Sequence, residues 1–150
     1  MSELPPYWVD VQAHTRALPT PRAPWLLQAM AIAEALYATD LGPPPHARLV
    51  WFAHELADFM QRSGPRAAVL IHGSLAAVGT LGALLAGPAG RLRPLHKLPL
   101  ALRTHALERL EKSPAGLPLF ALKGIFSILY YEHPDAAREV GFSVTRRARA

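Results

Sequence analysis

Apolar residues recur at helical spacing in the first half of the chain, in blocks that end at prolines and glycines. In Trp25–Leu41 they lie three or four positions apart, and Glu34 falls outside the stripe. His46–Arg62 repeats this pattern. Gly42 and three prolines follow the first block, and Ser63-Gly64-Pro65 follows the second. The pattern predicts two amphipathic helices joined by a tight loop.

The next block, Ala67–Gly87, contains no charged residue. As an α-helix it would be about 32 Å long, which is enough to cross a bilayer. Arg62 and Arg66 precede it and Arg91 and Arg93 follow it, so the charge asymmetry of a membrane-spanning helix is missing. We therefore favour a helix buried in the core or against a partner. Membrane contact and a true span are the alternatives.

The second half of the chain continues the helical pattern. Gly87–Pro99 is interpreted as a linker or extended segment, and Pro99–Lys112 as a short helix with a charged outer face. Leu117–Tyr131 is nearly all apolar, and a last short helix should start at Pro134 and end at Gly141. The sequence thus predicts an all-α fold, a single compact domain of five to six helices joined by Pro/Gly-rich loops.

This reading divides the chain into three parts. Residues 1–24 are expected to form an extended N-terminal arm, 25–142 the helical domain and 143–150 a basic C-terminal tail. Hydrophobic residues make up 51% of the chain and charged residues 18%, so there is enough apolar material for a core. The N-terminus lacks the basic and apolar regions of a signal peptide, so we expect a cytoplasmic protein.

Charge and cysteine content exclude several functions. The net charge is +5, but the basic residues are scattered apart from the tail, so we expect no nucleic-acid binding. The chain has no cysteine, which excludes disulfides, thiolate metal sites and iron–sulfur clusters. A basic surface leaves an acidic partner or a membrane surface as a further possibility.

No motif predicts catalysis or cofactor binding. The Gly-rich dinucleotide fingerprint and the phosphate-binding loop are missing, so we expect no nucleotide or flavin site in this chain. His72 and Ser74 lack the GxSxG context of a hydrolase and are interpreted as a polar spot in a buried helix. His54 and Asp58 share a helix face, but nothing supplies a third metal ligand, so a surface hydrogen bond or salt contact is expected.

A chain of 150 residues can hardly bury the whole surface of two nearly uncharged helices. The apolar surface that stays exposed should therefore contact a partner or a membrane. Aromatic anchors usually carry most of the binding energy of such an interface. Lys123, inside the second of these helices, should extend to the surface or meet a partner's carboxylate. The partner-interface candidates are Leu117, Phe120, Lys123, Ile125, Phe126, Tyr130, Tyr131, Pro134 and Phe142.

The order of short motifs in Arg91–Phe142 resembles a known family. A linker with Pro94 and Leu95 leads to a Leu-Glu-Arg-Leu run and Ser113, then Phe-Ala-Leu-Lys, Tyr-Tyr, a proline and Gly-Phe. Ala47–Arg66 shows a weaker similarity. This arrangement resembles the gluconate 2-dehydrogenase subunit 3 family, the small accessory subunit of FAD-dependent GMC-type oxidoreductases.

The resemblance implies a helical protein without chemistry of its own. It would bind and stabilise a flavoprotein large subunit, which holds FAD and the catalytic histidine, and could reach a membrane or the periplasm through that partner. Some family members carry a twin-arginine leader, and this chain departs from them in having none. Two alternatives remain open: a stand-alone helical membrane-associated protein, and an independent enzyme that uses His72 or His54.

Overall fold

The computed structural model describes residues 18–88 and 93–141. Most of the predicted N-terminal arm, Phe142 and the predicted basic tail lie outside the described residues. The helices are α2 (Pro24–Leu36), α3 (His46–Arg62), α4 (Gly64–Leu85), the 3₁₀ turn η2 (Leu95–Lys97), α5 (Leu100–Glu111), α6 (Leu117–Tyr131) and α7 (Pro134–Glu139). In the described part, the prediction of an all-α single domain is confirmed.

The prolines and glycines end the helices largely where the sequence predicts. The bounds of α3 and α6 agree with the prediction, but α2 ends five residues early, at Leu36 rather than Leu41. Thr39 and Gly42 exchange backbone hydrogen bonds of 3.0 and 2.9 Å, which replace the helical ones. Gly42 closes this turn with a φ of 117°, a conformation that other residues rarely adopt.

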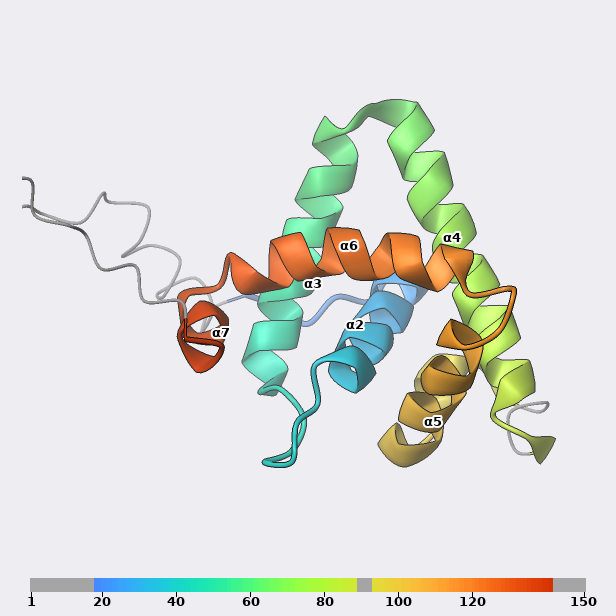
Figure 1. Cartoon of the computed structure of the whole chain (residues 1–150). Coiled ribbons are helices and arrows are strands. Elements are labelled where there is room, and N and C mark those ends of the chain that lie inside the picture. The colour runs from blue at the N-terminus through green and yellow to red at the C-terminus, as the bar shows by residue number, and fades with distance from the viewer. Residues whose placement is uncertain (1–17, 89–92, 142–150) are drawn as a thin grey trace, which may run out of the picture.

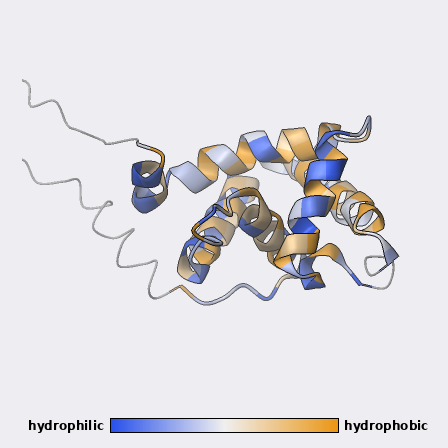
Figure 2. Cartoon of the chain, turned by 60° about the horizontal axis from the view of Figure 1, so that its bottom comes forward, coloured by the Kyte–Doolittle hydropathy of each residue, from blue (hydrophilic) through white to orange (hydrophobic). Residues whose placement is uncertain are grey.

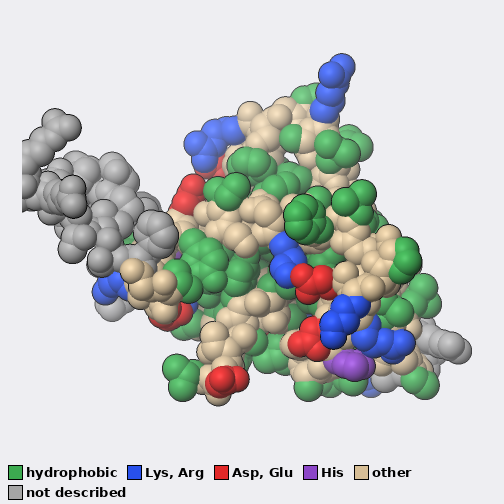
Figure 3. Space-filling view, in the orientation of Figure 1, with side chains coloured by type: hydrophobic (Ala, Val, Ile, Leu, Met, Phe, Trp, Pro, Cys, Tyr) green, Lys and Arg blue, Asp and Glu red, His purple; other side chains and the backbone are tan. Residues whose placement is uncertain are grey.

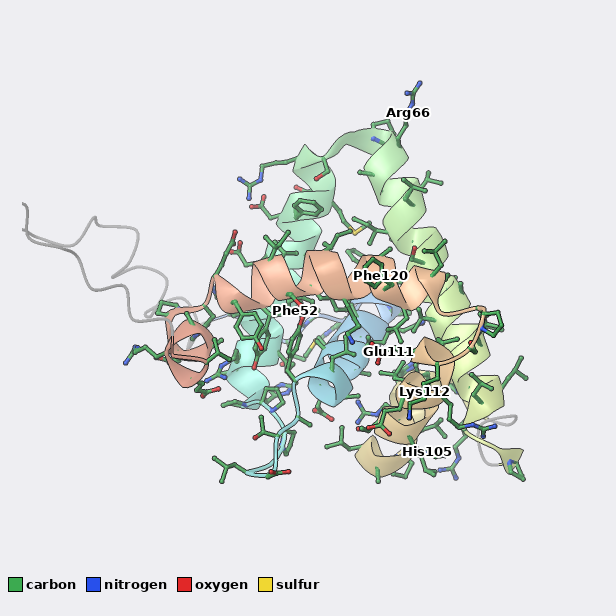
Figure 4. All side chains as sticks on the ribbon, in the orientation of Figure 1. Phe52, Arg66, His105, Glu111, Lys112 and Phe120 are labelled. Atoms are coloured by element: carbon green, nitrogen blue, oxygen red, sulfur yellow. The ribbon has the colours of Figure 1, made fainter. Side chains whose placement is uncertain are left out.

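The helices pack around α2, and α6 crosses the front of the molecule (Figure 1). The end of α3 and the start of α4 project together beyond α6 and form a helical hairpin. Phe52 of α3 lies behind α6 (Figure 4). Its ring meets that of Phe126 edge-on, with 4.8 Å between the centroids, and both side chains are fully buried. The core therefore lies between α6 and the α2–α3 pair.

The segment predicted as a linker or extended segment also contributes two leucines to the core. Leu95 in η2 is 1% exposed and Leu98 is 3% exposed. Leu95 packs against Gly82 of α4, where a Cβ atom would come within 3.2 Å of a Leu95 methyl group. Residues 93–99 of the segment interpreted as a linker or extended segment thus contain the short turn η2, and the leucines of this part fill space beside α4.

A second glycine, Gly79, leaves room for a side chain between α2 and α4. The Gln28 side-chain amide of α2 donates a hydrogen bond to the backbone carbonyl of Leu75. It occupies the space beside Gly79, where a Cβ would lie 1.9 Å from the Gln28 nitrogen. This glycine within an apolar helix therefore marks a contact with another helix rather than a site of low helix stability.

Two arginines are buried in the fold. Arg103, on the helix predicted to have a charged outer face, is 8% exposed. Its guanidinium donates to the carbonyls of Leu98 and Ala31 at 2.9 and 2.7 Å, and to the Glu34 carboxylate at 2.7 Å. This fork satisfies the buried charge and joins α5 to α2. Arg48 of α3 is buried in a similar way at the other end of the fold.

Candidate interaction surface

One side of α6 presents a continuous apolar stripe to solvent. Leu117, Phe120 and Ile128 are 74%, 75% and 68% exposed, and Tyr131 is 36% exposed. These positions, with Ala121 and Gly124 between them, share one face of a helix. We call these six residues the α6 stripe. Figure 2 shows hydrophobic residues along most of α6, whereas the neighbouring α7 is largely hydrophilic.

The opposite side of α6 belongs to the core. Leu119, Leu122, Phe126 and Tyr130 are at most 3% exposed. An α-helix that is apolar all round carries no periodicity to show which side is covered. Both sides of α6 are apolar, but only one of them is buried in this chain, and the other is left for a partner or for solvent.

The structure therefore separates the interface candidates into two groups. Phe126 and Tyr130 are core residues and Ile125 is partly buried against the core, so these three cannot act as free anchors. Leu117, Phe120 and Tyr131 lie on the α6 stripe, and Ile128, which sequence reasoning did not select, joins them. Pro134 begins α7 and is partly buried, and Phe142 lies outside the described residues.

Lys123 meets a carboxylate within its own chain. Its ammonium group lies 2.5 Å from the Glu111 carboxylate at the end of α5. Both side chains are largely exposed, at 38% and 53%, so the pair contributes little to stability. Lys123 lies next to Phe120 and Gly124 on the surface of α6, so the ion pair borders the α6 stripe. It gives the α6 stripe a polar rim, as is common around protein interfaces.

A tyrosine cluster fills the C-terminal end of α6. Tyr37 stacks on Tyr130 with 4.0 Å between the ring centroids, and Tyr131 meets both rings edge-on. Tyr37 also shares a hydrogen bond of 3.0 Å with Ser127. Burial raises the pKa of Tyr37 to about 12 and raises that of Tyr130 as well. These phenols stay protonated near neutral pH and act as packing groups.

Arg48 connects this cluster to α7. Its guanidinium donates to both Glu139 carboxylate oxygens at 2.8 and 2.9 Å and to the Tyr130 hydroxyl at 3.2 Å. The hydrogen bonds with Arg48 lower the pKa of Glu139, and those with Glu139 raise the pKa of Arg48. His133 accepts a hydrogen bond from the Asp135 backbone and so caps α7. Tyr130 and Glu139, near the end of the segment that resembles the family, therefore hold α7 against α3 through Arg48.

A second apolar surface lies on α4. By length and composition this helix could cross a membrane: its most apolar window has a mean hydropathy of 1.8, but only 22% of that window is buried. Ile71, Leu75 and Val78 pack into the core, whereas Val69 and Leu70 are each 71% exposed and Leu84 is 57% exposed. The expectation that this helix is buried is thus confirmed for one side only within the chain.

The structure places the candidate catalytic and ligand residues His72, His54 and Asp58 in separate contacts. His72 is exposed and packs edge-on against Trp25, so the prediction of a polar spot in a buried helix is wrong. His54 lies 2.9 Å from the Pro19 carbonyl, and Asp58 pairs with Arg62, as expected for surface contacts. Within residues 18–88 and 93–141, no group of three or more His, Cys, Asp or Glu residues could hold a metal ion.

Comparisons of the chain with protein-family models, with curated proteins and with solved structures find no match. Among the described residues, α6 and α4 each carry an exposed apolar surface from which a function can be argued.

Proposed function

We propose that this chain is a non-catalytic accessory subunit that binds and stabilises the large subunit of a FAD-dependent GMC-type oxidoreductase. The observation that carries the proposal is the α6 stripe, because it is an exposed apolar surface inside the segment that resembles the accessory-subunit family. FAD and the catalytic groups would belong to the partner.

The character of the α6 stripe supports a protein partner. Phe120 and Tyr131 are aromatic, and such residues are enriched among the side chains that dominate binding energy. Phe120 lies on the front of α6 and points outward (Figure 4). Between the large residues, Ala121 and Gly124 leave space for side chains of the partner. The stripe thus combines a large exposed aromatic residue, small residues beside it and the charged rim at Lys123.

The α6 stripe also makes a sharper test than deletion of the C-terminal half. Truncation at Gly116 would remove Leu122 and Phe126 from the core, so lost binding would only report unfolding. Phe120→Glu and Ile128→Glu instead change exposed side chains. Leu41→Glu is a matched control, because Leu41 is fully exposed, at 101%, in the α2–α3 loop.

The experiment is a tagged pull-down from the native host, with mass spectrometry and an absorbance spectrum of the eluate. We expect a stoichiometric flavoprotein with the wild type and with Leu41→Glu. Either α6 variant should reduce its affinity by about 30-fold or more, the effect of losing one dominant anchor. A colourless eluate without a flavoprotein would refute the proposal. Undiminished capture by both α6 variants would refute the assignment to α6.

A further inference from the structure

The exposed side of α4 is a single apolar face with a basic residue in line with it. Val69, Leu70 and Leu84 lie on this face with the small residues Gly73, Ala76 and Thr80. At about 100° per residue, all six positions fall within one side of the helix. We call them the α4 face. It extends over about 22 Å from Val69 to Leu84, and Figure 3 shows apolar side chains along this edge of the molecule.

Basic groups lie at both ends of the α4 face. Arg66 is exposed, falls in register with the face and points away from the tip of the α3–α4 hairpin (Figure 4). It makes no ion pair with any residue that the structure describes. At the other end, exposed Arg109 donates a hydrogen bond of 2.9 Å to the Leu85 carbonyl.

Acidic residues are missing from the same stretch of sequence. None occurs between Asp58 and Glu108, a stretch that includes the whole of α4 and η2. Asp58, near the end of α3, pairs with Arg62, so its negative charge is not paired with Arg66. The α4 face therefore combines an apolar surface, basic ends and no acidic group of its own helix. This pattern is complementary to an anionic, partly apolar surface.

We propose that the α4 face binds the surface of a membrane that contains anionic lipids, with α4 lying along the interface. Leu70 and Val69 would enter the boundary between headgroups and acyl chains, and Arg66 would contact lipid phosphates. A transmembrane arrangement is disfavoured because Ile71, Leu75 and Val78 hold the other side of α4 in the core. The proposal does not depend on association with a flavoprotein.

The test is co-sedimentation of the full chain with vesicles of phosphatidylcholine alone, or of phosphatidylcholine and phosphatidylserine in equal parts. We expect binding to the anionic vesicles that weakens with salt, and little binding to the neutral ones. Arg66→Gln should weaken binding about fivefold, the effect of one basic side chain near a charged membrane. Leu70→Glu and Val69→Glu should each weaken it by more than about tenfold.

Leu41→Glu is again the matched control, since it adds the same charge in the α2–α3 loop, at the opposite end of the molecule from the hairpin tip (Figure 1). It should bind anionic vesicles like the wild type, and circular dichroism should show that all variants are folded. Failure of the wild type to bind anionic vesicles would overturn the proposal, as would normal binding by folded Leu70→Glu and Val69→Glu. A wild-type dimer that Leu70→Glu converts to monomer, without vesicle binding, would assign the face to a second copy instead.

Discussion

Replacement of Arg103 tests whether a buried arginine holds α5 against α2. The Arg103 side chain is only 10% exposed and makes three hydrogen bonds, one of them to Glu34. Arg103→Met would keep most of the side-chain volume but leave two backbone carbonyls and one carboxylate without their donor. Because the Glu34 side chain is 28% exposed, water can form hydrogen bonds to its carboxylate and compensate part of this loss.

The expected cost can be worked from these contacts. Breaking a buried ion pair costs about 3–5 kcal/mol, and the partial exposure of Glu34 places this case near 3 kcal/mol. With a urea dependence of about 2 kcal/mol per molar, the unfolding midpoint should fall by about 1.5 M. Arg103→Lys should cost at least about 1.5 kcal/mol, since one ammonium group cannot reach three acceptors arranged as a fork.

The assay is urea unfolding followed by far-UV circular dichroism. Arg109→Met is the control, because Arg109 lies on the same helix but is exposed and makes a single hydrogen bond. Its free energy of unfolding should change by less than about 0.5 kcal/mol. Equal midpoints for the Arg103 and Arg109 variants would show that the buried fork does not stabilise the fold, and the reasoning would be wrong.

Three further predictions concern α6, α7 and α4. Phe126→Ala should lower the free energy of unfolding by about 3–5 kcal/mol and Phe120→Ala by less than about 0.5 kcal/mol; similar values in urea unfolding would contradict the assignment of the two sides of α6. The pKa of Glu139 is lowered by Arg48, so its contribution is present above pH 4.5 and lost as the pH falls below that value. Because the Glu139 side chain is 61% exposed and solvent screens its charge, Glu139→Gln should cost no more than about 1 kcal/mol at pH 7 and less at pH 3. An equal cost at both pH values would refute this linkage. Gly79→Ala should displace the end of the flexible Gln28 side chain rather than move α2, so the lost Gln28 hydrogen bond and the higher helix propensity of alanine should largely cancel in the melting temperature; a large decrease would show that Gln28 cannot move aside.

The helices were predictable because their determinants are local. In α3, apolar spacing marks the buried side, and Ser63, Gly64 and Pro65 mark the end. The predicted end of α2 was wrong for a local reason as well. Residues 37–41 could continue a helix by their composition, but the turn between Thr39 and Gly42 replaces the helical hydrogen bonds. The excess of apolar residues on α6 was visible in the sequence, although Ile128 was not selected from it.

The sequence could not predict which apolar residues of α6 are buried and which are exposed. Phe120 and Phe126 have the same side chain on the same helix, yet they are 75% and 0% exposed. The difference arises from where α6 crosses Phe52 of α3, a contact between residues distant in sequence. The same holds for Leu95, which fills the space beside Gly82, and for Arg48, which meets a carboxylate on α7.

The sequence by itself thus determined the all-α class, the positions of most helices and the excess of apolar residues on α4 and α6. Only the tertiary structure decided which side of each apolar helix is covered and which arginines are buried. The physical reason is that helix formation and termination depend on neighbours within a few residues. Burial depends on which helices pack together, and an evenly apolar helix carries no periodicity that would predict it.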